Sequence, residues 1–187
     1  MFQQIQKYLA ENNINSDLQH AYKAGYSTST ALTCLTDEWF KQIDVQSVIG
    51  VVCLDFSAAF DLIDHELLLM KLSAYGFRDS AIDLLKGYFL NRQQCVMFNG
   101  SLSSVETLQC GIPQGSCLGP LLYSIFIHDM PYVLKNTGMG IYADDTTMYA
   151  SSKSIEHVNM MLQQELNLVS EWIIENKLKL NVKKKLN

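Results

Sequence analysis

The sequence predicts an α+β fold in which helices pack against an antiparallel sheet. Two segments have the pattern of β-hairpins, one from 94 to 108 around Asn99-Gly100 and one spanning 139–149. In a third segment, 154–176, the apolar residues recur at the spacing of one helix face. Hairpins and amphipathic helices together, in a chain of 187 residues, indicate one domain or a large part of one.

Capping and chain-breaking residues define the other elements. Ser27 or Thr28 is the expected N-cap of a second helix, and Asp64 that of a third helix, which ends at Gly76. Pro120 suits the first turn of an apolar helix that follows a glycine-rich loop. The expected helices cover 3–13, 28–39, 65–75, 81–90 and the segment after Pro120, and a short terminal strand is expected at 178–182.

The composition is that of a core-rich globular protein rather than a disordered tail, with 48% hydrophobic and 18% charged residues. The net charge of −5 argues against a stand-alone nucleic-acid binder, because such proteins usually present a basic face. We expect no membrane segment, since the longest strongly apolar stretch, 118–127, is too short to span a bilayer and no secretory leader pattern follows Met1.

The five cysteines show no Cys-x-x-Cys spacing, and several of them lie in apolar runs. We therefore expect reduced thiols that pack as small hydrophobic residues in an intracellular protein, with nuclear and cytoplasmic locations both open. These cysteines are residues 34, 53, 95, 110 and 117.

Three aspartates stand where strands are expected to end. Asp55 lies in the apolar run 48–56, which is typical of a central strand covered on both faces, and Asp144-Asp145 follows Tyr142. Strand alternation places Asp144 on the same face as Tyr142. Mg²⁺ prefers oxygen ligands, and two such ions can promote in-line phosphoryl transfer. The alternative interpretation is that each aspartate only forms a turn.

A glycine-flanked loop between these motifs favours the first interpretation. The loop Gly111 to Ser116 opens an apolar helix, where backbone N–H groups and the positive helix end suit phosphates. Gln114 adds a side chain able to donate to a nucleotide. By contrast, Asp61, Asp64 and His65 are expected to cap a helix and to bond locally rather than bind metal. The other histidines (20, 128 and 157) have no ligand spacing and are expected to be packing or surface residues.

Several motifs resemble, in order and spacing, those of reverse transcriptases, most closely those of LINE-type (non-LTR) retrotransposons. The core motifs are LDFSAAFD at 54–61, GIPQGSCLGPLLYSIFI at 111–127 and YADDTTMY at 142–149. Supporting likenesses are HAYKAGYSTSTAL at 20–32, YFLNRQQCVMFNG at 88–100 and WIIENKLKLNVKK at 172–184. The resemblance covers almost the whole chain.

The resemblance implies an RNA-directed DNA polymerase palm plus partial fingers. Residues 1–47 would be partial fingers and 48–187 mainly palm, with 76–110 a fingers/palm insertion. The implied reaction is two-metal transfer of a nucleotide from a dNTP to a primer 3′-hydroxyl, with Mg²⁺ as the cofactor and Mn²⁺ as a substitute. The implied partners are an RNA template, a DNA primer, the dNTP and the remaining segments of a longer polyprotein.

The resemblance also assigns roles to individual residues. Asp55 and Asp144 would bind both metal ions, and Asp145 would assist. Phe60 would lie under the deoxyribose, where it clashes with a ribose 2′-hydroxyl. The other implied substrate contacts are the amides of Phe56, Ser57, Ala58 and Ala59 to the triphosphate, Gln114 and Gly115 in the nucleotide pocket, Ala143 near the primer terminus, and Lys184 near the pyrophosphate.

The chain departs from the family pattern in four ways. Lys185 follows Lys184 where the family usually has threonine. The family's Arg-Pro-Ile-Ser element would precede Met1, the thumb would follow Asn187, and we expect no endonuclease domain within these residues. We therefore expect a partial domain that is inactive on its own. The alternatives are a catalytically inactive remnant and a nucleic-acid-binding accessory fragment, which the acidic charge disfavours. A nucleotidyl cyclase fits Gln114 and Phe60 less well.

Overall fold

A three-stranded antiparallel sheet forms the centre of the fold. In the computed structural model, which describes residues 1–14 and 16–181, the strand order is β1-β7-β6. These strands are β1 (Val48–Leu54), β7 (Asp145–Ser152) and β6 (Gly138–Tyr142). The antiparallel sheet with packed helices confirms the predicted α+β class, and β6 and β7 confirm the predicted second hairpin.

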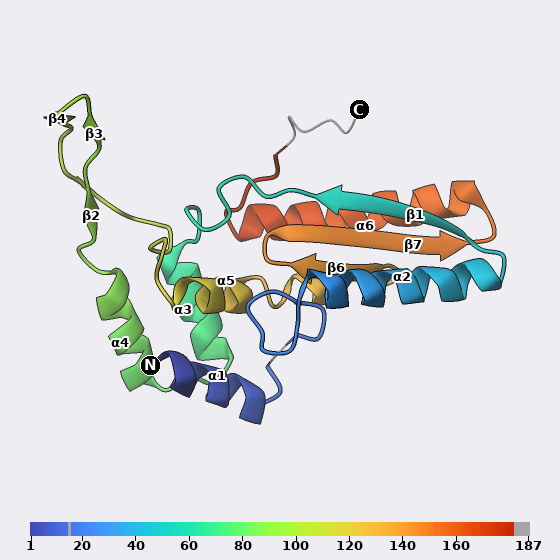
Figure 1. Ribbon diagram of the computed structural model, residues 1–187, viewed down its shortest axis with the longest axis horizontal. Helices are drawn as coiled ribbons and strands as arrows, with labels where there is room; N and C mark the ends of the chain where they lie inside the picture. Colours follow the sequence, from blue (N-terminus) through green and yellow to red (C-terminus); the bar gives the residue numbers. More distant parts are fainter. Residues whose placement is uncertain (15, 182–187) are drawn as a thin grey trace.

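Two long helices cover opposite faces of this sheet, as Figure 1 shows. On one face lies α6 (Ile155–Glu175), packed so closely that a Cβ atom at Gly50 of β1 would overlap Val158. On the other face lies α2 (Thr28–Asp44), whose Trp39 ring contacts the Tyr149 ring of β7 at 6.2 Å between centroids. Alternate residues of each strand therefore face α2 and α6.

The predicted helices are present. Ser27 caps α2 with a reciprocal hydrogen-bond pair to Thr30, and α2 runs five residues past the predicted end at Trp39. Asp64 caps α3 through the Leu67 amide at 3.0 Å, as predicted. The remaining helices are α1 (Phe2–Glu11), α3 (His65–Ala74), α4 (Asp79–Phe89), α5 (Gly119–Phe126) and a short 3₁₀ helix (Met130–Val133).

The predicted hairpin around Asn99-Gly100 is also present, and it projects away from the sheet (Figure 1). Both turn residues have positive φ, as in the type I′ turn that an Asn-Gly pair favours. Its side chains are largely exposed, with Phe98 at 73%. The strands are β2 (Gln93–Gln94) with β5 (Glu106–Thr107), and β3 (Met97–Phe98) with β4 (Ser101–Leu102).

The main core lies under α6 and around α5. The predicted stripe of α6 is buried at Val158, Leu162, Val169 and Trp172, which confirms that this face is core. Phe126 of α5 is fully buried in the same cluster that contains Trp172. Among the described residues, no helix combines the length and the apolar character needed to cross a membrane.

Two expectations about the strands were wrong or incomplete. The strand β1 is an edge of the described sheet and not a central strand, and Val51 is 43% exposed. An apolar β-branched run favours a strand but does not say how many neighbours it has. In the expected terminal strand, Leu180 forms an isolated bridge with Phe56, and Val182 lies outside the described residues.

The cysteines do not pack as small hydrophobic residues. Cys34, Cys53, Cys95 and Cys117 are exposed and Cys110 is half-buried, although all five are free thiols as predicted. Leu54 and Leu118 are buried, but the thiols of Cys53 and Cys117 directly before them are exposed. An apolar run in the sequence therefore does not determine whether a cysteine within it is buried.

Candidate active site

The sheet register brings the three predicted aspartates to one end of the sheet. Leu54, the last residue of β1, pairs with Thr146, so Asp55 directly follows the end of β1 where β7 begins at Asp145. Tyr142 pairs with Asp145, which leaves Ala143 and Asp144 as a two-residue turn, here called the aspartate turn. Asp55 and Asp144 are half-buried, whereas Asp145 is exposed. Two separate sequence motifs thus place their aspartates at the same end of the sheet.

The aspartate turn has an uncommon backbone conformation. Ala143 has a φ of 56°, in the left-handed region that favours glycine. Positive φ at the first residue of a two-residue hairpin loop is typical of a type II′ turn. This turn also explains why strand alternation cannot place Asp144: β6 ends at Tyr142, and the chain reverses before Asp144.

Gln19 contacts the aspartate turn from the N-terminal segment. Its Oε1 accepts a hydrogen bond from the Ala143 amide at 3.0 Å, and its Nε2 donates to the Ala143 carbonyl at 3.3 Å. Gln19 is only 6% exposed. Sequence reasoning missed this residue, because a single glutamine in an irregular segment carries no periodic signal.

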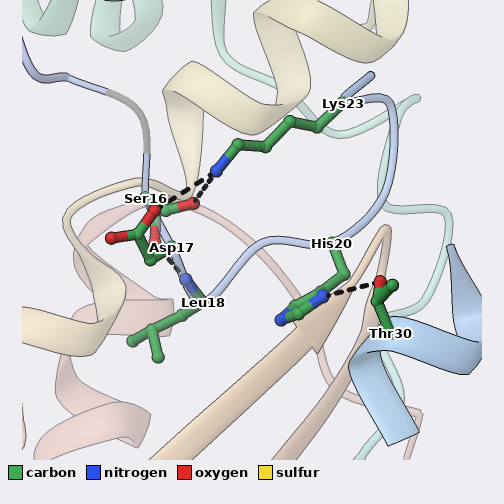
Figure 2. Close-up of polar contacts among 6 residues, drawn as sticks. All are labelled: Ser16, Asp17, Leu18, His20, Lys23 and Thr30. Carbon is green, nitrogen blue, oxygen red and sulfur yellow. Dashed lines mark hydrogen bonds and ion pairs between the residues drawn. The ribbon is translucent and has the colours of Figure 1, made fainter. Parts of the chain in front are cut away.

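The segment around Gln19 is held by its own polar contacts. Figure 2 shows Lys23 reaching back to Asp17 at 3.3 Å and His20 bonding through Nδ1 to Thr30 at 3.1 Å. His20 is buried, and burial followed by the nearby Lys23 charge lowers its pKa below the ordinary value. His20 is therefore a packing residue, as predicted.

Asp55 has a partner that the sequence did not suggest. Asn181 donates from Nδ2 to Asp55 Oδ2 at 3.0 Å and from its backbone amide to the Asp55 carbonyl at 2.8 Å. Two residues on, the Ser57 amide donates to the Lys179 carbonyl at 2.8 Å. The segment 179–181 thus lines the chain that follows β1. The Ser57 amide, one of the four that the family resemblance assigns to the triphosphate, is therefore already hydrogen-bonded to this segment.

Two aromatic rings pack against Phe60. The Phe60 ring stacks on Tyr123 at 4.6 Å between centroids and meets the edge of Tyr22 at 6.4 Å. Burial, with the nearby Asp144 charge next, raises the pKa of both tyrosines. The Tyr123 hydroxyl is buried without a hydrogen-bond partner among the described residues. Phe60 therefore packs against two rings, Tyr123 and Tyr22, whose hydroxyl groups both sense the Asp144 charge.

The glycine-rich loop lies next to Phe60. The Ile112 amide donates to the Phe60 carbonyl at 2.9 Å, and Gln114 donates from Nε2 to Asp61 Oδ1 at 3.0 Å. Gln114 and Gly115 are both exposed, and Gly115 has a φ of +77°. The loop borders a hollow that Asp61 and Gln114 help to line. The two predicted pocket residues thus lie on the surface beside the proposed sugar site.

Asp64 and His65 have the local roles predicted for them. Asp64 caps α3 and pairs with Lys177, and His65 bonds through Nε2 to the Gly111 carbonyl at 2.7 Å. The His65 ring also stacks on Phe89 at 4.5 Å. Both residues therefore secure the glycine-rich loop and α3, and neither is oriented as a metal ligand.

The aspartates have the donor chemistry that Mg²⁺ requires, but their side chains do not form a complete binding site. Within residues 1–14 and 16–181, no group of three or more His, Cys, Asp or Glu side chains is close enough to hold a metal ion. Mg²⁺ is usually bound by one or two carboxylates, with waters and substrate phosphates as the other ligands. Asp55 and Asp144 fit that pattern in type and location. Lys184 lies outside the described residues.

The fold of this chain is also found in solved telomerase structures. The structure of telomerase from Candida albicans with a fragment of telomeric RNA matches 98% of this chain and 34% of that chain, with a TM-score of 0.72 and 12% identity. An apo telomerase from Candida tropicalis matches 98% of this chain and 35% of that chain, with a TM-score of 0.68 and 10% identity. These identities establish a common fold alone.

The family model "Reverse transcriptase (RNA-dependent DNA polymerase)" matches residues 1–186, and the chain belongs to this family. Its relatives are non-LTR retrotransposon proteins. The probable RNA-directed DNA polymerase from transposon BS of Drosophila melanogaster is 31% identical over 96% of this chain and 20% of its own length. The enzyme from mobile element jockey of Drosophila funebris is 30% identical over 90% of this chain and 19% of its own. The chain thus spans about a fifth of these relatives.

Proposed function

We propose that this chain is the catalytic palm, with part of the fingers, of an RNA-directed DNA polymerase encoded by a non-LTR retrotransposon. The proposed reaction transfers a nucleotide from a dNTP to the 3′-hydroxyl of a DNA primer paired with an RNA template. The observation that supports this most is the strand register, which ends β1 just before Asp55 at the same end of the sheet as the aspartate turn. The match of residues 1–186 to the reverse transcriptase family adds to it.

In this proposal, the three aspartates bind the catalytic ions. Asp55 and Asp144 would hold two Mg²⁺ ions, for which Mn²⁺ can substitute, and Asp145 would assist. When bound, such ions activate the attacking hydroxyl and stabilise the leaving group. The half-buried carboxylates of Asp55 and Asp144 favour this role, because a cation is less screened there than at a fully exposed site.

The residues around Phe60 would bind the incoming nucleotide. Phe60, fixed by its stacking on Tyr123, would exclude the ribose 2′-hydroxyl by steric clash. Gln114 and Gly115 would line the base side, and Ala143 would lie near the primer terminus. The amides of Phe56, Ala58 and Ala59 would hold the triphosphate, with Ser57 joining them only if its bond to Lys179 opens. Lys184 would approach the pyrophosphate.

The test replaces the matched fifth of the transposon BS polymerase with this chain. We expect the chimaeric protein to extend a DNA primer on an RNA template with Mg²⁺, and Asp144→Asn to abolish extension. The Asn side chain keeps the shape of Asp144 but removes its charge, so RNA binding and thermal unfolding should not change. Equal synthesis by both proteins would overturn the proposed role of Asp144.

The same assay distinguishes an active polymerase domain from the alternative, a catalytically inactive remnant. A chimaera that folds and binds RNA as the parent polymerase does, yet makes no DNA, would establish a remnant. The 187-residue chain alone is expected to copy no template. Positioning of primer and template supplies much of the rate, and a net charge of −5 repels a polyanion.

A further inference from the structure

Gln19 makes a paired contact with the aspartate turn that resembles the pairing of a neighbouring strand. Its side-chain amide bonds to both backbone groups of Ala143, at 3.0 Å and 3.3 Å. Its Oε1 also accepts from the Ala21 amide at 2.8 Å. The side chain is buried, so these bonds are protected from water. One side chain therefore fixes the peptide groups on both sides of Ala143.

The conformation of Ala143 explains why such a contact is needed. With a φ of 56°, its Cβ atom crowds the following carbonyl oxygen, a contact that glycine would avoid. A residue in this region keeps its conformation only where the surrounding structure holds it. Asp144 follows directly, so the position of its carboxylate depends on this turn.

The segment that carries Gln19 is itself anchored to the sheet. The Ile141 amide donates to the Leu18 carbonyl, and the His20 amide donates to the Ile141 carbonyl, both at 2.9 Å. Figure 2 shows the ion pair of Lys23 with Asp17, which closes the same segment on itself. Gln19 thus joins a fixed part of the N-terminal region to the end of β6.

We propose that Gln19 is a positioning residue that holds the aspartate turn, so that Asp144 and Asp145 can bind a divalent cation. This inference rests on the proposed polymerase function. Gln19 does not touch the substrate or the ion in this proposal, and it acts only through the Ala143 backbone. A purely structural role would instead change stability without changing cation affinity.

The test compares two identical substitutions in the 187-residue chain. Gln19→Met keeps the length of the side chain but removes its hydrogen bonds to Ala143. Gln42→Met is the matched control, because Gln42 also joins the N-terminal region to the hairpin, through Ser151 at the far end of β7. The readouts are hydrogen exchange of the Ala143 amide and the dissociation constant of Mn²⁺ measured by electron paramagnetic resonance.

We expect Gln19→Met to remove the protection of the Ala143 amide and to weaken Mn²⁺ binding by about tenfold, as is usual for the loss of an outer-shell contact. Gln42→Met should change neither. In the double variant Gln19→Met/Ala143→Gly, glycine accepts the left-handed φ without help, so Mn²⁺ affinity should recover. This rescue also provides the test if the single variant unfolds.

The outcomes distinguish failure of the positioning role of Gln19 from failure of the proposed metal site. Unchanged Mn²⁺ affinity in Gln19→Met, with wild-type binding that Asp144→Asn abolishes, would overturn the positioning role alone. Absence of Mn²⁺ binding to the wild-type chain, or equal binding by Asp144→Asn, would overturn the proposed metal site and with it the inference. A failure of the double variant to regain Mn²⁺ affinity would also contradict positioning through Ala143.

Discussion

Substitution of Gly50 tests how closely α6 packs on β1, the strand that ends directly before Asp55. A Cβ atom at Gly50 would overlap Val158 and lie 2.7 Å from Leu162 Cδ1, well inside normal contact. Val158 cannot easily move, because a β-branched residue in a helix has one strongly preferred rotamer. Overpacking of this kind costs about 2 kcal/mol, which lowers the melting temperature of a chain of this size by about 4–8 °C.

Urea and thermal unfolding of Gly50→Ala measure this cost directly. The matched control is Gly87→Ala in α4, where nothing lies within 4 Å of the added atom. That change should stabilise the chain by about 0.5–1 kcal/mol, because alanine is the better helix former. In a Val158→Ala background, the penalty at Gly50 should shrink by about 1 kcal/mol. Equal effects at the two glycines, or a penalty at Gly50 that the Val158→Ala background leaves unchanged, would refute the packing argument.

Three further changes test the surroundings of the site. Tyr123→Phe should stabilise the chain by about 1 kcal/mol, because it removes a buried hydroxyl without a partner among the described residues. Phe60→Ala in the chimaeric polymerase should raise incorporation of rNTP relative to dNTP, measured by primer extension. In Asp64→Asn, the free energy of unfolding should fall less steeply in acid than it does in the wild-type chain. Burial alone would raise the pKa of Asp64, but hydrogen bonds from Lys177 and the Leu67 amide keep that pKa below the ordinary 3.8. The ionised Asp64 therefore adds to the free energy of unfolding above pH 3.8, and this stabilisation is lost as the pH falls through the lowered pKa.

For each of these three predictions, one result would contradict it. Destabilisation by Tyr123→Phe would mean that the hydroxyl has a partner, such as a bound water. An unchanged rNTP to dNTP ratio in Phe60→Ala would assign sugar selection to another residue. Parallel stability curves for wild type and Asp64→Asn between about pH 2 and pH 6, measured by urea unfolding, would exclude a linked titration at Asp64.

Local signals predicted the elements that depend on neighbours in sequence. The stripe of α6, the caps at Ser27 and Asp64 and the Asn99-Gly100 turn were all confirmed. These features follow from periodicity and from hydrogen bonds within a few residues. The sequence also predicted that the acidic motifs lie where strands end: Asp55 directly follows β1, and Asp144 lies in the turn between β6 and β7.

The long-range features could not be predicted in the same way. The edge position of β1 depends on which strands pair with it, and the exposure of Cys53 depends on what covers the strand. Gln19 bonds to a residue 124 positions away, and Asn181 to one 126 positions away. A single polar residue in an irregular segment gives no pattern from which such a contact can be predicted.

The most direct test of the central claim is anomalous diffraction from crystals of the chain grown with Mn²⁺ and a dNTP. The account predicts a manganese peak bonded to carboxylate oxygens of both Asp55 and Asp144, with the triphosphate on the same ion. Carboxylates that approach within about 6 Å can share two ions spaced roughly 3.5–4 Å apart. A peak elsewhere on the chain, or Asp55 and Asp144 held too far apart to share an ion, would contradict the polymerase site.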